Sequence, residues 1–204
     1  MNCKKSLKAA AVALSICMTA VSGAVSPDML KSNSKITANA LNANDFDYYN
    51  NFESGAGDWE GRGGATAAVS SDNTYEGSKA LYVSGRTDSW NGCQIALGSQ
   101  FTAGSSYSFS AAVSPKGKKA SEMMLSIQYS TGGEDQYGHI GSLTVQPDKW
   151  GVISCSEFTL PADGSNFVLY VETASGSSDF YIDEIAVGAV GAVKNNMTFG
   201  TQLG

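Results

Sequence analysis

The chain of 204 residues has little histidine, cysteine or positive charge, and each shortage argues against a class of function. One histidine, His139, and four cysteines without zinc-site spacing argue against a zinc centre. That histidine has no Gly-x-Ser-x-Gly elbow or cysteine partner, so a nucleophilic triad is unsupported as well. Only 13 residues are Lys or Arg against 19 Asp or Glu, and an acidic surface repels phosphate backbones and anionic lipid. Nucleic acid and membrane are therefore poor candidate partners, and a neutral ligand fits better.

The sequence also lacks an apolar run of the roughly 20 residues that a membrane-spanning helix needs. Its main apolar run, residues 9–21, follows three lysines and precedes the small residues Ser22-Gly23-Ala24. This pattern predicts a secretory signal peptide over residues 1–24, in preference to a membrane anchor. Removing it takes away three lysines and no acid, which moves the net charge from −6 to −9. We therefore expect a secreted, extracellular and clearly acidic protein.

Cysteine is scarcer still once the signal peptide is removed. Cys3 and Cys17 leave with it, and Cys93 and Cys155 remain. Two cysteines in an exported chain can form one disulfide, but they are equally suited to be buried apolar residues. The sequence leaves both possibilities open.

Short runs of β-branched and aromatic residues recur from about Tyr48 onward, separated by clusters of Gly, Ser, Asn, Asp and Pro. The runs lie at residues 67–69, 80–83, 94–97, 107–113, 123–127, 140–145, 150–153, 167–171 and 180–187. Even spacing of short strands, without a helical period, predicts an all-β fold built as an antiparallel β-sandwich or barrel. We expect this domain at residues 47–188. A flexible linker at 25–46 precedes it, and a C-terminal tail or the start of another linker follows at 189–204.

A strand that binds a ligand presents outward side chains from a rigid backbone, and residues 167–172 have a suitable pattern. Side chains alternate along a strand, with Phe167, Leu169 and Val171 toward the core and Val168, Tyr170 and Glu172 away from it. An aromatic ring offers the C–H face of a sugar a flat apolar platform, and a carboxylate accepts hydrogen bonds from its hydroxyls. An ordinary solvated sheet face is the alternative interpretation.

Two glycine-rich turns carry further candidates, at residues 59–64 and 85–92. Trp90 lies in a polar loop with little local core, which makes it a candidate for stacking on a ligand. Trp59 and Trp150 lie next to strands and are expected to pack in the structure. Arg62 can fork two hydrogen bonds to adjacent sugar hydroxyls or pair with an acid of the protein.

These segments, together with three others, resemble the family 22 carbohydrate-binding modules over about residues 47–188. The resemblance rests on residues 52–53, 59–64, 75–81, 84–92, 169–172 and 180–184. Its most specific block is Ser-Gly-Arg-Thr-x-x-Trp-Asn-Gly at residues 84–92. Members of that family are xylan-binding β-jelly rolls, usually attached to bacterial xylanases. The resemblance therefore implies a jelly roll with a concave face that binds xylan, with mixed-linkage β-glucan as a second candidate ligand, beside an appended glycoside hydrolase.

The resemblance also implies which side chains bind the sugar. Carried over by position, they are Arg62, Trp90, Tyr137, Tyr170 and Glu172. Trp90 and Tyr137 would stack on xylose rings, Arg62 and Glu172 would hydrogen-bond the hydroxyls, and Tyr170 would line the groove. Tyr129 is an alternative to Tyr137, and His139 would share a strand face with Tyr137.

A structural calcium ion is a second implication of the resemblance. The expected metal residues are Glu53 on the first strand, Asp183 on the last, and Lys79 in the turn at residues 75–80, whose backbone carbonyls would complete an oxygen shell. Without the ion, each acid would cap a turn or pair with a lysine.

Two other functions remain as alternatives to a binding module. A glycoside hydrolase would need two acids across the scissile bond, one with a raised pKa, and only Glu172 falls in the inferred cleft. Glu134 and Asp135 lie near Tyr137, but in a solvated glycine-rich turn. A structural spacer would gain nothing from an exposed aromatic groove around Trp90. We therefore expect a non-catalytic module.

Overall fold

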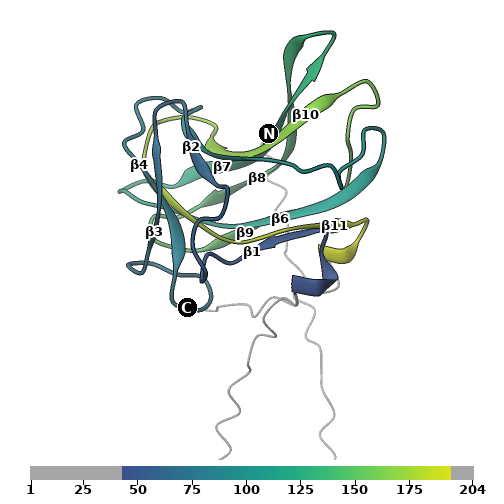
Figure 1. Ribbon diagram of the computed structural model, residues 1–204. Coiled ribbons are helices and arrows are strands. Elements are labelled where there is room, and N and C mark those ends of the chain that lie inside the picture. The colour runs from purple at the N-terminus through teal and green to yellow at the C-terminus, as the bar shows by residue number, and fades with distance from the viewer. Residues whose placement is uncertain (1–42, 194–204) are drawn as a thin grey trace, which may run out of the picture. The chain divides into compact units, whose positions relative to one another are not determined.

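Two antiparallel sheets packed face to face make up the domain in the computed structural model, which describes residues 43–193 (Figure 1). One sheet has the order β3-β4-β11-β6-β9, with β1 alongside β11, and the other has the order β2-β5-β10-β7-β8. The strands are β1 Tyr48–Asn50, β2 Glu60–Arg62, β3 Thr66–Ser70, β4 Ala80–Ser84, β5 Gly92–Ala96, β6 Ser106–Pro115, β7 Ser121–Thr131, β8 Glu134–Val145, β9 Gly151–Thr159, β10 Ser165–Thr173 and β11 Phe180–Ala189. A short 3-10 turn, η2 (Ala43–Asp45), precedes β1. The predicted all-β antiparallel jelly-roll sandwich is confirmed.

Each run of residues predicted to form a strand lies mostly within one, and two short strands were missed. Arg62, expected in a glycine-rich turn, is the last residue of β2. Glu53, expected on the first strand, lies in the turn after β1, and Glu134 and Asp135 begin β8 instead of occupying its turn. The predicted signal peptide at 1–24, nearly all of the linker and most of the tail lie outside the described residues. Within residues 43–193, no helix is long and apolar enough to cross a bilayer.

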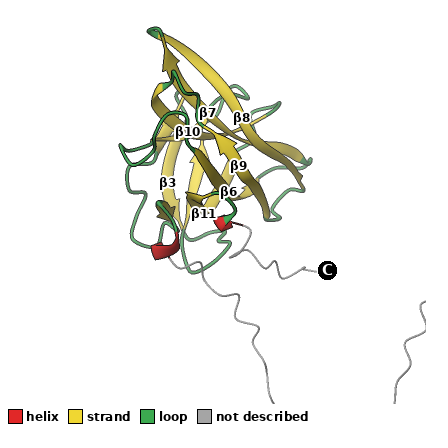
Figure 2. Cartoon of the chain, turned by 90° about the vertical axis from the view of Figure 1, so that its right-hand side faces the viewer, coloured by secondary structure: helices red, strands yellow, loops and turns green. Residues whose placement is uncertain are grey.

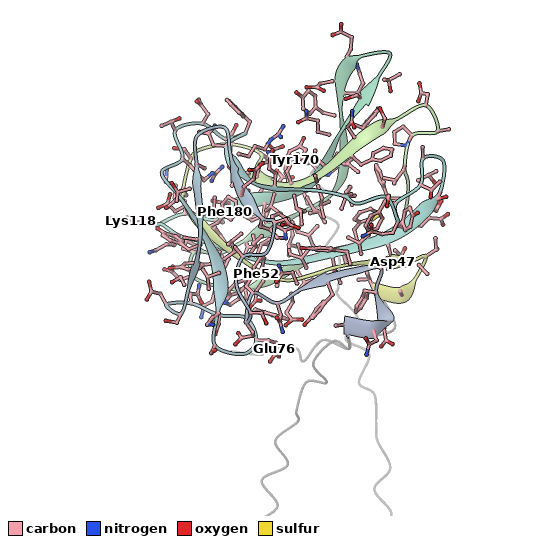
Figure 3. The ribbon with its side chains drawn as sticks, viewed as in Figure 1. Asp47, Phe52, Glu76, Lys118, Tyr170 and Phe180 are labelled. Atoms are coloured by element: carbon pink, nitrogen blue, oxygen red, sulfur yellow. The ribbon has the colours of Figure 1, made fainter. Side chains whose placement is uncertain are left out.

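The core fills the space between the two sheets. Phe52, Phe109 and Phe180 are fully buried there, and Figure 3 labels Phe52 and Phe180 below Tyr170. The predicted alternation along β10 is confirmed, because its inward residues 167, 169 and 171 all belong to this core. Trp59 is buried as predicted, and its indole N–H donates to the Tyr48 hydroxyl at 2.8 Å.

The structure also shows the surroundings of Trp150 and of the two cysteines, Cys93 and Cys155. Trp150 is partly buried, and its indole N–H donates to Asn73 Oδ1 at 2.9 Å. Cys93 and Cys155 are both free thiols, so the disulfide alternative is wrong. Cys93 is a core residue, and burial raises the pKa of its thiol above the ordinary value.

Candidate functional site

The outward side of the β2-β5-β10-β7-β8 sheet, called here the outer face, collects the predicted sugar-binding residues. Residues directly opposite each other in neighbouring strands point to the same face. Tyr170 on β10 is opposite Gln94 on β5 and Ser126 on β7. Tyr137 on β8 is opposite Gln128, and Gln128 is opposite Val168. The pairing therefore places Tyr170 and Tyr137 on one surface, although β8 and β10 are not adjacent.

The β7–β8 hairpin extends that surface beyond the body of the sheet. Its tip rises above the neighbouring strands at the top of Figure 1, and it projects in the same way in the turned view of Figure 2. Gly132 and Gly133 form the two-residue turn with φ of 61° and 90°, a backbone that glycine adopts without strain. The turn fixes the register between Thr131 and Glu134, and hence the face to which each residue of β8 points as far as His139, after which the register shifts.

Register also decides between the two candidate tyrosines. Tyr137 is 61% exposed and lies on the outer face. Tyr129 packs against the core instead, with its ring centroid 6.2 Å from that of Phe167. Tyr137 is therefore the residue available to a ligand. His139 is exposed and shares the face of Tyr137, as the extended strand predicted.

Arg62 reaches from the edge strand β2 across the middle of the outer face. Its Nη1 donates to Gln94 Oε1 at 2.7 Å and to Gln128 Oε1 at 2.9 Å. Its guanidinium carbon lies 4.2 Å from the ring centroid of Tyr170 and 6.0 Å from that of Tyr137. The cation is thus held over an aromatic ring, an arrangement that is attractive in itself.

Tyr170 lies beneath that arginine and is only 4% exposed. It does not belong to the core cluster, and its position opposite Gln94 places it on the outer face. Burial raises the pKa of its hydroxyl, and Glu172 raises it further. Tyr170 was predicted to line the groove, and in the structure it supports Arg62 from below.

The loop that carries Trp90 is organised by Arg86, which is 7% exposed. The Arg86 guanidinium donates to the backbone oxygens of Asn91, Ser89 and Ser178 and to the hydroxyl of Thr173. The Asn91 side chain is buried too, and its Oδ1 accepts three hydrogen bonds from residues 87 and 88. A polar loop without a local core is thereby held rigid, which fixes the backbone on either side of Trp90.

Trp90 is 54% exposed and lies against the turn that follows Arg62. Gly63 in that turn has a φ of 65°, and a Cβ added to it would lie 2.4 Å from Trp90 Cζ3. Only a residue without a side chain leaves room for the indole there. The close contact brings Trp90 next to Arg62, although 28 residues separate them in sequence.

Glu172 completes the predicted set, two residues beyond Tyr170 on the same strand and face. Burial raises the pKa of its carboxyl, while the charges of Arg62 and Arg86 lower it. The half-buried carboxylate accepts no hydrogen bond from the described part of the chain, which leaves its oxygens to accept from a ligand. Exposed rings, a fixed guanidinium and a carboxylate on one surface form a set of groups suited to a polyhydroxylated ligand.

Sequence reasoning missed four residues that shape this surface. They are Glu60, Arg86, Gln94 and Gln128. Glu60 is a second acid on the outer face, where Glu172 alone was expected. Alternation along the strand at 94–97 would have placed Gln94 outward, but no local signal linked it to Arg62.

The three predicted metal residues meet around the turn at residues 75–79. Asp183 is fully buried, and its Oδ2 accepts hydrogen bonds from two successive backbone amides of that turn. Glu53 Oε1 accepts from the amides of Ser78 and Lys79, both at 2.7 Å, and Lys79 Nζ donates to the Glu53 carbonyl at 2.8 Å. Over residues 43–193, no group of three or more acidic, histidine or cysteine side chains is arranged to hold a metal.

Donor chemistry at this turn nevertheless suits a hard cation. Burial, together with the charge of the neighbouring Glu184, raises the pKa of Asp183 to about 7, although hydrogen bonds from three backbone amides lower it. Burial raises the pKa of Glu184 as well, and the charges of Glu76 and Glu53 add to this effect. Carboxylate oxygens are ligands that Ca²⁺ prefers, and in this structure those of Glu53 and Asp183 cap the turn by accepting from its amides.

A cavity of about 290 Å³ lies where β5 ends and β10 begins, lined by residues 97–99, Phe101, Ala103 and residues 164–167. None of the predicted sugar-binding residues lines it. The outer face itself is an open surface with two exposed rings, Trp90 and Tyr137, which suits a long polymer better than an enclosed small molecule.

Comparison with known proteins agrees with this geometry. Residues 45–178 match the model of a family described as a carbohydrate binding domain. A xylanase/β-glucanase of Ruminococcus flavefaciens is 38% identical over 143 residues, which cover 69% of this chain and 18% of that protein. An endo-1,4-β-xylanase Y of Acetivibrio thermocellus is 38% identical over 151 residues, or 72% of this chain and 14% of that protein. The chain thus matches only a small part of these enzymes' length.

Solved structures of single modules match over nearly their whole length. The C-terminal family 22 carbohydrate binding module of Clostridium thermocellum Xyn10B superposes with a TM-score of 0.71 at 34% identity, covering 74% of this chain and 99% of that one. A xylan-binding domain of the same family gives a TM-score of 0.69 at 34% identity, covering 72% and 96%. The matched region is a non-catalytic module, and the chain belongs to the family 22 carbohydrate-binding modules.

Proposed function

We propose that the outer face binds xylan and xylo-oligosaccharides without changing their bonds. Trp90 and Tyr137 offer their exposed ring faces to xylose rings, whose C–H-rich surfaces are apolar. Arg62 donates to hydroxyls and Glu172 accepts from them. The single observation that carries the proposal is that Arg62, Tyr137 and Glu172 lie on one sheet surface, with Trp90 against the turn that follows Arg62.

Binding of this kind is modest in strength. Each stacked ring contributes about 1–2 kcal/mol after its desolvation and ordering costs, so two rings and a few hydrogen bonds give roughly micromolar to millimolar affinity. Modest affinity suits a module that keeps an attached enzyme near an insoluble substrate. Tethering raises the local concentration of a glycoside hydrolase on the plant cell wall without any added chemistry.

Ligand choice is tested by titration calorimetry with xylohexaose and cellohexaose. The expected result is measurable binding of xylohexaose by the wild type, with loss of affinity in the Trp90→Ala variant. Mixed-linkage β-glucan is the second candidate ligand, because one relative is named a xylanase/β-glucanase. Release of reducing sugar from xylan by the purified chain would contradict the module proposal, and identical migration of wild type and variant in xylan gels would favour a spacer.

We propose in addition that the protein is exported through a signal peptide at residues 1–24, which lie outside the described part of the chain. The basic start, the apolar run and the small residues at 22–24 support this. A substrate as large as cell-wall xylan is reached only outside the cell. Mass spectrometry of the protein recovered from culture medium tests it, with a mature N-terminus near Val25 expected.

Calcium at the turn of residues 75–79 is the third proposal. Glu53 and Asp183 would hold the ion through their carboxylates and Lys79 through its backbone carbonyl. The ion would supply positive charge among converging acids and so link the segment after β1, this turn and β11. The sugar-binding residues lie on the other sheet, so its role would be structural.

A further inference from the structure

Arg62 is restrained by two glutamines that no motif singled out. The guanidinium has five N–H donors, two of them on Nη1. Those two go to Gln94 Oε1 and Gln128 Oε1, from two different strands, at 2.7 and 2.9 Å. Nη1 is thereby saturated, and Nη2 makes no hydrogen bond within residues 43–193.

Gln94 is itself held in one orientation. Its Nε2 donates to Glu60 Oε1 at 2.8 Å, on the neighbouring strand β2. A side-chain amide that donates on one side must present its oxygen on the other, and that oxygen faces Arg62. A hydrogen-bond network therefore links the Glu60 carboxylate through the Gln94 amide to the Arg62 guanidinium. Gln128, on β7, adds a second acceptor for the same guanidinium nitrogen.

The ring of Tyr170 is a third contact of the guanidinium. Tyr170 lies beneath it, with the guanidinium carbon 4.2 Å from the ring centroid. The Arg62 Nε is buried without a hydrogen-bond partner among residues 43–193, a cost that the contacts of Nη1 and of the ring have to offset. A free arginine on a surface would instead lose considerable rotamer entropy when it bound a ligand.

We propose that Gln94 and Gln128 are positioning residues, which hold the Arg62 guanidinium over Tyr170 and leave its Nη2 to donate to the hydroxyls of a neutral polysaccharide. This inference rests on the proposed function of the outer face. It adds that part of the affinity resides in two side chains that act through Arg62, because they remove its ordering cost before the ligand arrives.

A double-mutant cycle separates positioning from direct contact. Gln128→Met keeps the length of the side chain and removes the acceptor. Alone, it is expected to weaken xylohexaose binding about threefold to tenfold, the range of one net hydrogen bond. In an Arg62→Ala background, the same change is expected to alter the dissociation constant less than about twofold, since its partner is gone. Equal losses in both backgrounds would show direct contact with sugar and overturn the proposal.

Gln136→Met is the matched control for that cycle. Gln136 is an exposed glutamine on β8, opposite the core-packed Tyr129, and it should leave affinity unchanged. The variant Gln128→Glu keeps an acceptor oxygen and is expected to keep Arg62 ordered. Thermal unfolding of each variant checks that loss of affinity does not come from loss of the fold.

A measurement without ligand keeps this inference distinct from the proposed function. Side-chain NMR of the free protein should show restricted rotation of the Arg62 guanidinium, and rapid averaging in the Gln94→Met/Gln128→Met variant. Failure of the wild type to bind xylohexaose would contradict the proposed function and leave the positioning role unaffected. An Arg62 side chain equally mobile in wild type and double variant would sink the positioning role, whatever the ligand.

Discussion

Replacing Trp90 by alanine tests the site most directly, because that side chain is 54% exposed and projects from a rigid loop. A fully covered tryptophan buries at most about 250 Å², so its exposed part offers about 130 Å², of which a sugar on one ring face covers roughly half. At about 25 cal/mol per Å², that area contributes about 1.6 kcal/mol, or about 15-fold in the dissociation constant. Trp90→Ala is therefore expected to weaken xylohexaose binding by about that factor.

Titration calorimetry measures the loss, and affinity electrophoresis in xylan gels shows it as reduced retardation. Tyr75→Ala is the matched control, since Tyr75 is 37% exposed in the turn before β4 and does not belong to the outer face. Thermal unfolding of Trp90→Ala should change little, because the loop is held by Arg86 and Asn91. Wild-type affinity in a folded Trp90→Ala protein would refute the placement of the ligand on this surface.

The remaining predictions concern the neighbours of Trp90 and the acids. Gly63→Ala places a Cβ 2.4 Å from the indole, so it should displace Trp90 and weaken binding by a similar factor, while circular dichroism stays that of a β protein. Sugar binding should weaken as pH falls, beginning above the usual glutamate range of about 4.3, because burial raises the pKa of Glu172 and the protonated carboxyl is a poorer acceptor. Titration at several pH values checks this, and Glu172→Gln, weaker throughout, should lose that dependence. Chelator should lower the midpoint of thermal unfolding of the wild type and not of Asp183→Asn; equal shifts would argue against calcium at that turn.

Much of the fold could be predicted because strand period and turn residues are local signals. The alternation in residues 167–172 is enough to assign Phe167, Leu169 and Val171 to one face of a strand, and all three are core residues. The short strand β2 was missed because three residues with a glycine in the middle show no period, and the strand is defined instead by its pairing with β5.

The candidate site was predictable only as a set of residue types. The family resemblance identified Arg62 and Tyr170 as separate binding residues. It did not predict that the Arg62 cation covers the Tyr170 ring, because that contact joins two strands that are distant in sequence. Gln94 and Gln128 were missed for the same reason. A glutamine on a strand face has no distinctive local signal, and its importance here comes from the guanidinium that reaches it from β2.

By itself, the sequence determined that this is an antiparallel β-sandwich or barrel whose exposed groups suit a neutral sugar, because alternation, turn residues and charge are properties of short segments. Only the tertiary structure decided that Tyr137, and not Tyr129, faces the ligand, and that Tyr170 is covered by Arg62. Both facts follow from register and packing between strands. A shift of one residue in the β7–β8 pairing would exchange the two faces of β8, and no short segment of the chain encodes that pairing alone.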